Sequence, residues 1–286
     1  MFAIVGFVVV IVCVVGGYML SHGNLHILFQ PNEVLIICGA AAGAFLIGNP
    51  PKVVKAVAGS IGKIFSAKGY EKQDYMESLL LLDDIFIKIR KEGLISIESD
   101  VESPEKSKVF SKYPKVLANH HALAFITDTL RTVMTTTIAS HELEALLDAE
   151  IEALHEEQMH PAHAIANVAD GMPALGIVAA VLGVIITMGK IKEPPEVLGH
   201  HIGAALVGTF LGVLLSYGFV APMGRNLGFI ADEEKEYLNV FKVGIVTFAN
   251  GAAPPIAIEF ARRVIPEHHK PSFLETEQTI KQSRKK

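Results

Sequence analysis

The side chains most suited to metal chemistry form one histidine-rich cluster. His155, His160 and His163 lie close together in the sequence, and Glu156 and Glu157 stand beside the first of them. Histidine and carboxylate side chains are common metal ligands, but this spacing matches no recognised site, and a solvated polar face explains the same pattern. We therefore predict no metal site and no cofactor.

Other reactive patterns are also missing from the sequence. It has no phosphate-binding glycine loop, dinucleotide-binding fingerprint, nucleophile elbow or zinc-protease motif. Cys13 and Cys38 lie within apolar runs and resemble small core residues more than a disulfide. The net charge is −5, and no lysine run is interleaved with aromatic residues, which argues against nucleic-acid binding. An enzyme is not expected.

The composition of the chain and its long uncharged stretches indicate a membrane protein. Hydrophobic residues make up 50% of the chain and charged residues 19%, with a mean hydropathy of +0.39. A span needs about 20 mostly apolar residues. Stretches without charge cover residues 2–20, 34–47, 171–189 and 202–220. The expected fold is all-α, with four spans and a helical cytoplasmic domain.

The second of these stretches is the shortest. Extending it to residues 30–49 nearly gives a span, but the extension includes Glu33. The alternative is a buried re-entrant hairpin. Residues 2–20 lack the basic start and cleavage site of a signal peptide, so we interpret them as a permanent span.

Lysine and arginine positions set the expected orientation. Residues 21–33 contain neither, whereas Lys52 and Lys55 directly follow the second span. Positive residues stay on the cytoplasmic side, so both termini and the long central loop are expected there. The predicted organisation is spans one and two in 1–50, a cytoplasmic helical domain in 51–167, spans three and four in 168–221, and a cytoplasmic helix with a polar tail in 222–286.

The cytoplasmic parts are expected to be helical. Residues 51–69 combine apolar side chains at helical spacing with four lysines and no acid. Such a helix can lie on anionic lipid or pack on neighbouring helices, and both interpretations stay open. Helical periodicity recurs within residues 79–89, 123–137, 143–154 and 238–248. From about Pro271 the chain is expected to be a polar tail ending in Arg284, Lys285 and Lys286.

Carboxylates, lysines, arginines and histidines are missing deep in spans one, three and four, although ion transport normally requires an ionisable group within the membrane. Asp170 lies only at the entrance to span three, where it is expected to begin the helix. If the chain moves ions, a partner must therefore supply the carboxylate. Thr209 lies mid-span in span four, Pro173 near the start of span three, and Pro222 at the end of span four.

Small residues recur at four-residue spacing in the spans. The repeats are Gly39/Gly43, Gly199/Gly203 and Gly208/Gly212/Ser216. This spacing allows close helix packing, within or between subunits, although glycine is also simply common in membrane helices. Two linked repeats in span four favour tight packing.

Three segments together resemble a known family. They are residues 170–183 (Asp-Gly-Met-Pro-Ala-Leu-Gly-Ile-Val-Ala-Ala-Val-Leu-Gly), 207–212 (Val-Gly-Thr-Phe-Leu-Gly) and 254–260 (Pro-Pro-Ile-Ala-Ile-Glu-Phe). With 16–18 and 30–31, they resemble the MotA/TolQ/ExbB family, and within it the stator subunits of the flagellar motor. The resemblance extends to about Thr276.

This resemblance implies a function and a set of partners. Stator subunits form a homo-oligomeric ring, expected to be a pentamer, in the bacterial inner membrane. The ring surrounds a peptidoglycan-anchored MotB-type protein, which supplies the membrane aspartate, and ion flow turns the ring against the rotor switch protein. By residue matching, Arg90 and Glu98 would contact the rotor, Pro173 and Pro222 would lie at the ends of the ion path, and Ala180 and Thr209 would face the partner helix.

Two alternatives concern the energised process and the ion. A TolQ- or ExbB-like energiser of the outer membrane is the other family role, but those proteins have one span before the large loop and this chain has two. Sodium-driven relatives carry threonine where this chain has Ala180 and Gly208. Sodium needs several oxygen ligands, and Thr209 would offer the one hydroxyl near the partner carboxylate, so we predict proton coupling.

Overall fold

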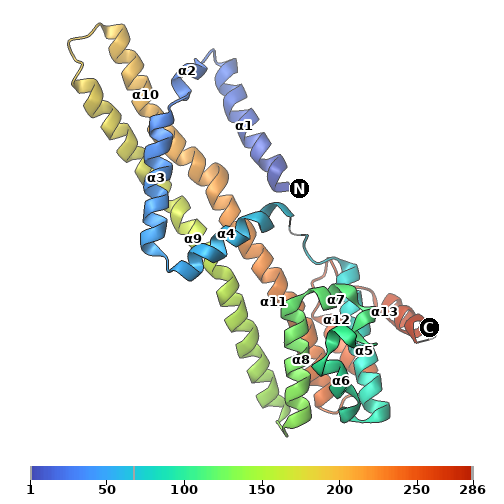
Figure 1. Ribbon diagram of the computed structural model, residues 1–286. Helices are drawn as coiled ribbons and strands as arrows, with labels where there is room; N and C mark the ends of the chain where they lie inside the picture. Colours follow the sequence, from blue (N-terminus) through green and yellow to red (C-terminus); the bar gives the residue numbers. More distant parts are fainter. Residues whose placement is uncertain (1, 67, 285–286) are drawn as a thin grey trace. The chain divides into compact units, whose positions relative to one another are not determined.

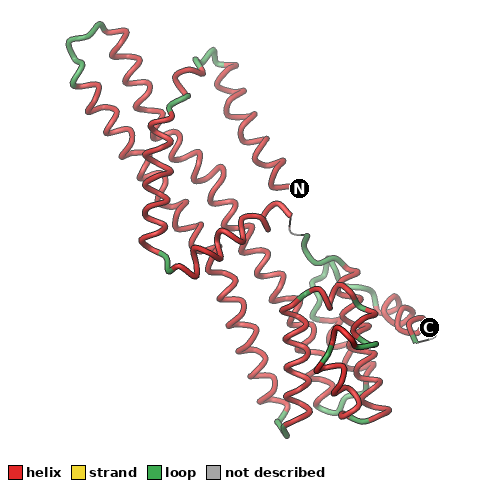
Figure 2. Tube along the Cα trace, in the orientation of Figure 1, coloured by secondary structure: helices red, strands yellow, loops and turns green. Residues whose placement is uncertain are grey.

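The computed structural model describes residues 2–66 and 68–284, all of them in helices or the loops between helices, without a β-strand in those ranges (Figure 2). They form two compact units, each built from two separate stretches of the chain. The first unit comprises Met1–Ala67 and Gln158–Ile230, and the second comprises Lys68–Glu157 and Ala231–Lys286. Lys285 and Lys286, the end of the expected tail, lie outside the described residues.

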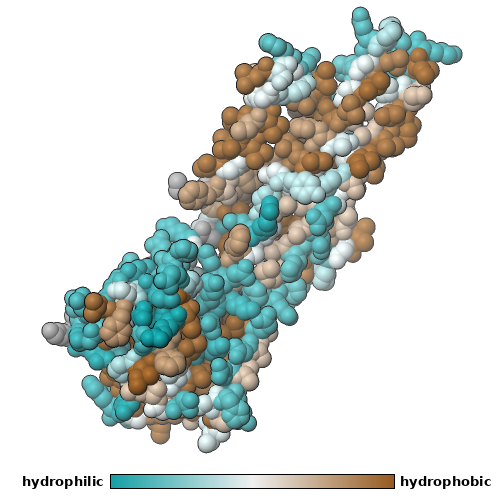
Figure 3. Space-filling view, turned by 180° about the vertical axis from the view of Figure 1, so that it is seen from behind, coloured by the Kyte–Doolittle hydropathy of each residue, from teal (hydrophilic) through white to brown (hydrophobic). Residues whose placement is uncertain are grey.

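The first unit contains the membrane-spanning helices. In the described chain, four helical stretches are long and apolar enough to cross a membrane, which agrees with the expected number. Apolar side chains gather on the visible face of the spans in Figure 3. Cys13 and Cys38 are free thiols on the surface rather than core residues. The helices of this unit are α1 (Phe2–Leu20), α2 (Leu25–Leu28), α3 (Pro31–Gly48), α4 (Pro51–Ser66), the later part of α9 (Ser140–Met188), α10 (Pro195–Val213), the π-helix η4 (Leu214–Val220) and the start of α11 (Ala221–Ala249) (Figure 1).

The second span is a single helix, so the re-entrant hairpin is wrong. Pro31 opens α3 at a position where the missing backbone donor costs nothing, and the helix continues without interruption to Gly48. The buried residues of α3 are Glu33, Ile37 and Ala41. Their spacing of four places all three on one face. Glu33 therefore belongs to the packed face of the span.

Two expected helix boundaries are absent. Asp170 does not begin a helix, because α9 runs unbroken from Ser140 to Met188 with Pro161 and Pro173 inside it. Pro222 does not end span four, because α10 continues through η4 into α11. In η4 the Ala221 N–H donates to the Ser216 carbonyl, five residues back. This wider turn accommodates a proline that cannot donate its own backbone hydrogen bond.

The second unit is a small helical domain with its own core. Tyr75, Leu79, Leu82, Phe86 and Phe241 are nearly inaccessible to solvent at its centre. Its helices are α5 (Lys72–Glu92), η1 (Leu94–Ile97), α6 (Glu98–Glu102), η2 (Pro104–Lys106), η3 (Phe110–Lys112), α7 (Pro114–Ala118), α8 (His120–Thr135), the first part of α9, the later part of α11, α12 (Pro254–Arg263) and α13 (Phe273–Ser283).

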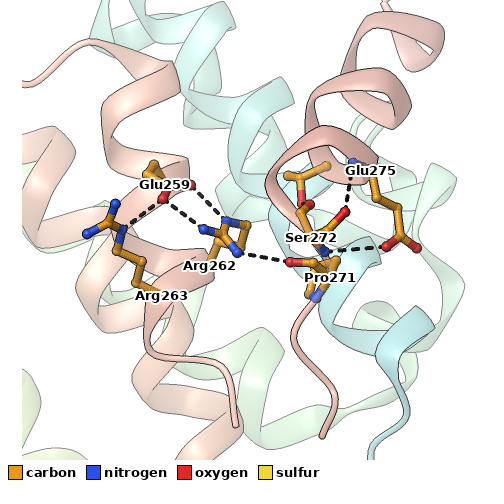
Figure 4. A network of polar contacts seen from close by, with 7 residues as sticks. Glu259, Arg262, Arg263, Pro271, Ser272 and Glu275 are labelled. Atoms are coloured by element: carbon orange, nitrogen blue, oxygen red, sulfur yellow. Dashed lines mark hydrogen bonds and ion pairs between the residues drawn. The ribbon is translucent and has the colours of Figure 1, made fainter. Parts of the chain in front are cut away.

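The expected polar tail is instead the helix α13. Ser272 caps it, accepting a hydrogen bond from the Glu275 N–H at 3.2 Å, while the Glu275 carboxylate accepts from the Ser272 N–H (Figure 4). At its far end, Arg284 donates two hydrogen bonds, at 2.7 and 3.0 Å, to Asp83, whose side chain is 3% exposed. The polar composition of this segment did not predict a helix, because the side chains that hold the helix in place are themselves polar or charged.

A second set of contacts fixes the loop before α13. Glu259 on α12 accepts hydrogen bonds from Arg262 and Arg263, each at 2.8 Å (Figure 4). Arg262 also donates to the Pro271 carbonyl at 3.0 Å. The hydrogen bonds from Arg262, and to a lesser extent from Arg263, lower the pKa of Glu259 to about 2. The network therefore joins α12 to the start of α13.

The basic helix α4 packs within the first unit. Val57 and Ile64 are buried against α9 and α11, where they meet Ile165 and Leu227. This supports the expectation that the segment packs on its neighbours. The side chain of Ile61 remains 41% exposed, so part of the apolar face is still available to lipid.

Candidate functional site

The expected ion-path residues lie along a seam of small residues between α9 and α10. Gly176 and Gly212 face each other so closely that a Cβ on Gly212 would lie 2.8 Å from the Gly176 Cα and 2.7 Å from the Met172 carbonyl. Further along, Ser216 donates a 2.6 Å hydrogen bond to the Ala169 carbonyl. The repeat Gly208/Gly212/Ser216 therefore packs two helices of one subunit against each other.

Ala180 on α9 and Gly208 on α10, the residue before Thr209, meet in this seam. A Cβ on Gly208 would lie 3.0 Å from the Ala180 nitrogen and 3.1 Å from the Ala179 Cβ. Thr209 follows on α10 and is partly buried. The structure thus brings Ala180 and Thr209 to the same level of facing helices. A threonine side chain at position 208 would require these helices to separate.

Pro173 lies opposite an irregular part of the facing helix. The contacts Gly176–Gly212 and Ala169–Ser216 flank it, so Pro173 is level with the start of η4. Proline removes a backbone hydrogen bond from α9, and the π-turn loosens the ladder of the facing helix. Both helices are therefore weakened at one level, about two turns from Ala180.

Pro222 is not brought together with Pro173. It follows Val213, the last residue of α10, by nine positions and lies beyond η4, in α11. It lines a cavity of about 360 Å³ together with Phe7 of α1 and Ile64 of α4. The structure thus places the two prolines at different points along the helix pair, with Pro222 next to α1 and α4.

One carboxylate in the seam, that of Glu33, was not expected from the sequence pattern. A Cβ on Gly208 would lie 2.9 Å from Glu33 Oε2, and a Cβ on Gly183 would lie 3.7 Å from Glu33 Oε1. Glu33 therefore places a carboxylate at the level of Ala180 and Thr209, in addition to the Thr209 hydroxyl. Hydropathy counted Glu33 as the edge of a short span, but its spacing of four from the apolar Ile37 could have revealed a buried position.

The expected rotor-facing residues lie on the second unit. Arg90 is in the last turn of α5 and Glu98 is the first residue of α6, and both side chains are exposed. Neither forms an ion pair with another described residue. Gly93 ends α5 with φ +87°, a conformation that favours glycine, and so sets the turn between them.

A partly buried ion pair holds α6 beside α5. Lys88 contacts Asp100 at 2.6 Å, and the Ser107 hydroxyl donates to the other Asp100 oxygen at 2.5 Å. Asp100 is largely buried. Because Asp100 is two residues after Glu98, this contact fixes the backbone that presents Glu98 to solvent.

The histidine cluster does not converge on one point. No group of three or more histidine, cysteine, aspartate or glutamate side chains in the described chain is placed to hold a metal ion. His155 instead lies 3.6 Å from Asp232 and 3.4 Å from the Ala231 carbonyl. His201 lies 3.0 Å from Lys190 near the loop between α9 and α10.

Comparison with known proteins settles the family. The family model described as Motility protein A N-terminal matches residues 4–93, and that of the MotA/TolQ/ExbB proton channel family matches residues 118–239. Motility protein A of Salmonella typhimurium is 41% identical over 98% of this chain and 95% of its own length. The chain belongs to the MotA/TolQ/ExbB proton channel family. The resemblance inferred from sequence is confirmed.

Other members and solved structures agree with this assignment. Motility protein A of Escherichia coli K12 is 40% identical over 98% of the chain and 95% of its own length. The structure of the flagellar MotAB stator complex from Bacillus subtilis matches with a TM-score of 0.77, at 22% identity over 96% of this chain and 100% of that chain. The fold is therefore that of this family, and the chain is a multi-pass membrane protein.

Proposed function

We propose that this chain is a flagellar stator subunit that couples proton flow to rotor torque. A ring of subunits, a pentamer, surrounds a MotB-type partner in the bacterial inner membrane, with both termini cytoplasmic. The observation that carries the proposal is the 41% identity to a motility protein A, because it extends over 98% of the chain and so includes both units. Two spans before the large loop distinguish the chain from the TolQ- and ExbB-like alternative.

Surface composition supports assembly within a membrane. Helix α1 has no buried residue, and α9 exposes apolar side chains such as Ile185, which is 61% exposed. Apolar surfaces of this extent require lipid or neighbouring subunits. The proposed roles rest on residue matching to the family: Ala180 and Thr209 face the partner helix, Pro173 and Pro222 lie along the ion path, and Arg90 and Glu98 contact the rotor switch protein.

Motility restoration tests the function. A strain without its own stator receives this chain together with its MotB-type partner, and swimming speed is measured with potassium replacing sodium at fixed pH and ionic strength. We expect swimming that is independent of sodium and abolished by a protonophore. A proportional fall in speed as sodium is withdrawn would overturn proton coupling, and no swimming despite normal membrane levels would overturn the stator function.

A further inference from the structure

Glu33 stands out because it is buried and one of its two carboxylate oxygens has no hydrogen-bond partner among the described residues. Its side chain is on the packed face of α3, and the residue is 9% exposed. Its Oε2 atom accepts no hydrogen bond from any residue that the structure describes. Buried carboxylates normally have hydrogen-bond or charge partners, so this one is an exception that requires a physical explanation.

The carboxyl group lies well inside the apolar part of the unit. It faces Gly183 of α9 and Gly208 of α10. Each glycine is six residues from the nearer end of its uncharged stretch, 171–189 or 202–220, which corresponds to about 9 Å along a helix. Glu33 is therefore near the level of Ala180 and Thr209 and does not lie at the membrane surface.

Among the described residues, no lysine, arginine or histidine donates a hydrogen bond to the buried Oε2 atom of Glu33. The uncharged stretches of α9 and α10 that face it contain no lysine, arginine or histidine. Lys190 and His201 lie toward the loop and contact each other at 3.0 Å, and His26 on α2 is exposed. The Thr187 hydroxyl is occupied, because it donates to the Gly183 carbonyl at 2.8 Å. A carboxylate here would be stabilised by binding a mobile cation.

We infer that Glu33 is a proton-binding carboxyl that each subunit contributes to the membrane ion path, in addition to the carboxylate of the partner. The inference rests on the proposed stator function. Sodium does not suit the position, because it requires several oxygen ligands and the seam around Glu33 is closed by glycine and alanine. A proton needs one carboxylate oxygen. The small residues at 183 and 208 leave the space that the carboxyl group fills.

Carbodiimide labelling tests the site directly. Dicyclohexylcarbodiimide adds to a protonated carboxyl in an apolar site, and an acyl shift from oxygen to nitrogen leaves a stable N-acylurea without a leaving group. The probe is applied to the purified complex whose partner aspartate is replaced by asparagine, and peptides are identified by mass spectrometry. We expect labelling of Glu33 that is lost in Glu33→Gln and retained in Glu196→Gln, the exposed control. Absence of label on Glu33 would overturn the inference.

Swimming separates a proton-binding role from a structural one. Glu33→Gln keeps the size of the side chain but cannot release a proton, so we expect normal complex levels and loss of most swimming. Glu33→Asp retains the acid and should preserve part of it. If the wild-type chain restores swimming and Glu33→Gln swims equally well, the inference fails while the proposed function stands. If the wild-type chain restores none, the proposed function fails, and the labelling result still decides whether Glu33 holds a proton.

Discussion

At the scale of single residues, the exposed charges and the buried charges of the second unit have different roles. Arg90 and Glu98 project into solvent on either side of Gly93. Asp83 and Asp100 are buried and paired with cations. The exposed charges are available to a partner, whereas the buried, paired charges hold helices together.

Charge reversal at Arg90 or Glu98 should impair motility without affecting folding. Exposed side chains without an ion pair contribute little to stability. We expect Arg90→Glu and Glu98→Lys to reach near-normal membrane levels with reduced swimming, and a complementary reversal on the rotor switch protein to restore part of it. Immunoblots of membrane fractions and tracking of swimming cells measure both. Degradation of the variants would instead indicate a structural role.

Glu259 should make the second unit acid-sensitive. Its pKa is lowered from the usual 4.5 to about 2 by Arg262 and Arg263, so its contribution to stability is present above the unfolded value and is lost as pH falls toward the folded value. We expect Glu259→Gln to lower thermal stability near neutral pH, with the difference from wild type vanishing between about pH 4.5 and about pH 2.

The matched control for that measurement is Glu277→Gln. Glu277 pairs with Lys281 on the surface of α13, where the two side chains are 44% and 66% exposed. An exposed pair of this kind is screened by solvent and should change the melting temperature little. Equal effects of the two substitutions on the purified complex would contradict the role of Glu259.

At the scale of helices, the long elements are irregular where they face each other. Pro173 on α9 lies level with the π-turn that begins at Leu214. Pro173→Ala adds an N–H that can complete the helical ladder and stiffen this level of α9. We expect normal assembly with slow or absent rotation, measured as torque in tethered cells. Normal torque would show that bending here is not required.

The glycine seam should tolerate no larger residue at its closest point. A Cβ on Gly212 would lie 2.7 Å from a backbone oxygen, whereas one on Gly199 meets no atom within 4 Å. We expect Gly212→Ala to destabilise the helix pair by about 1–3 kcal/mol and Gly199→Ala to cost little. Thermal melting of the purified complex compares them, and similar losses for both would contradict close packing at Gly212.

Sequence alone identified elements better than boundaries. Hydropathy located all four spans, because an apolar stretch of sufficient length is a direct signal. It could not show that α9 and α10–α11 continue beyond the spans, since a helix that leaves the membrane carries no break signal. Glu33 was missed because the glycines that it contacts are distant in sequence. For α13 a signal was present: Ser272 and Glu275 have the spacing of a capping box.

At the scale of the whole molecule, a subunit without its partner should be closed to protons. At Gly176 and Gly212 the backbones of α9 and α10 are in direct contact, so no chain of water passes between the two helices at that level. On the proposal above, Glu33 binds a proton, but the partner carboxylate is needed to complete the path across the membrane. We expect vesicles containing the chain alone to keep an imposed pH gradient as long as empty vesicles do. Faster collapse, followed with an internal pH dye, would show that one subunit type suffices.

The ion pair between Arg284 and Asp83 also determines when the second unit can be completed during biosynthesis. The two residues are 201 positions apart, and residues 158–230, which include spans three and four, are translated between them. At about 5–20 residues per second, helix α5 waits about 10–40 s on the ribosome-bound chain before its last contact exists. Until then the part of α5 that packs against α13 is uncovered, whereas η1 and α7, which are translated earlier, already pack on other parts of it. The later spans therefore enter the membrane before the second unit is complete.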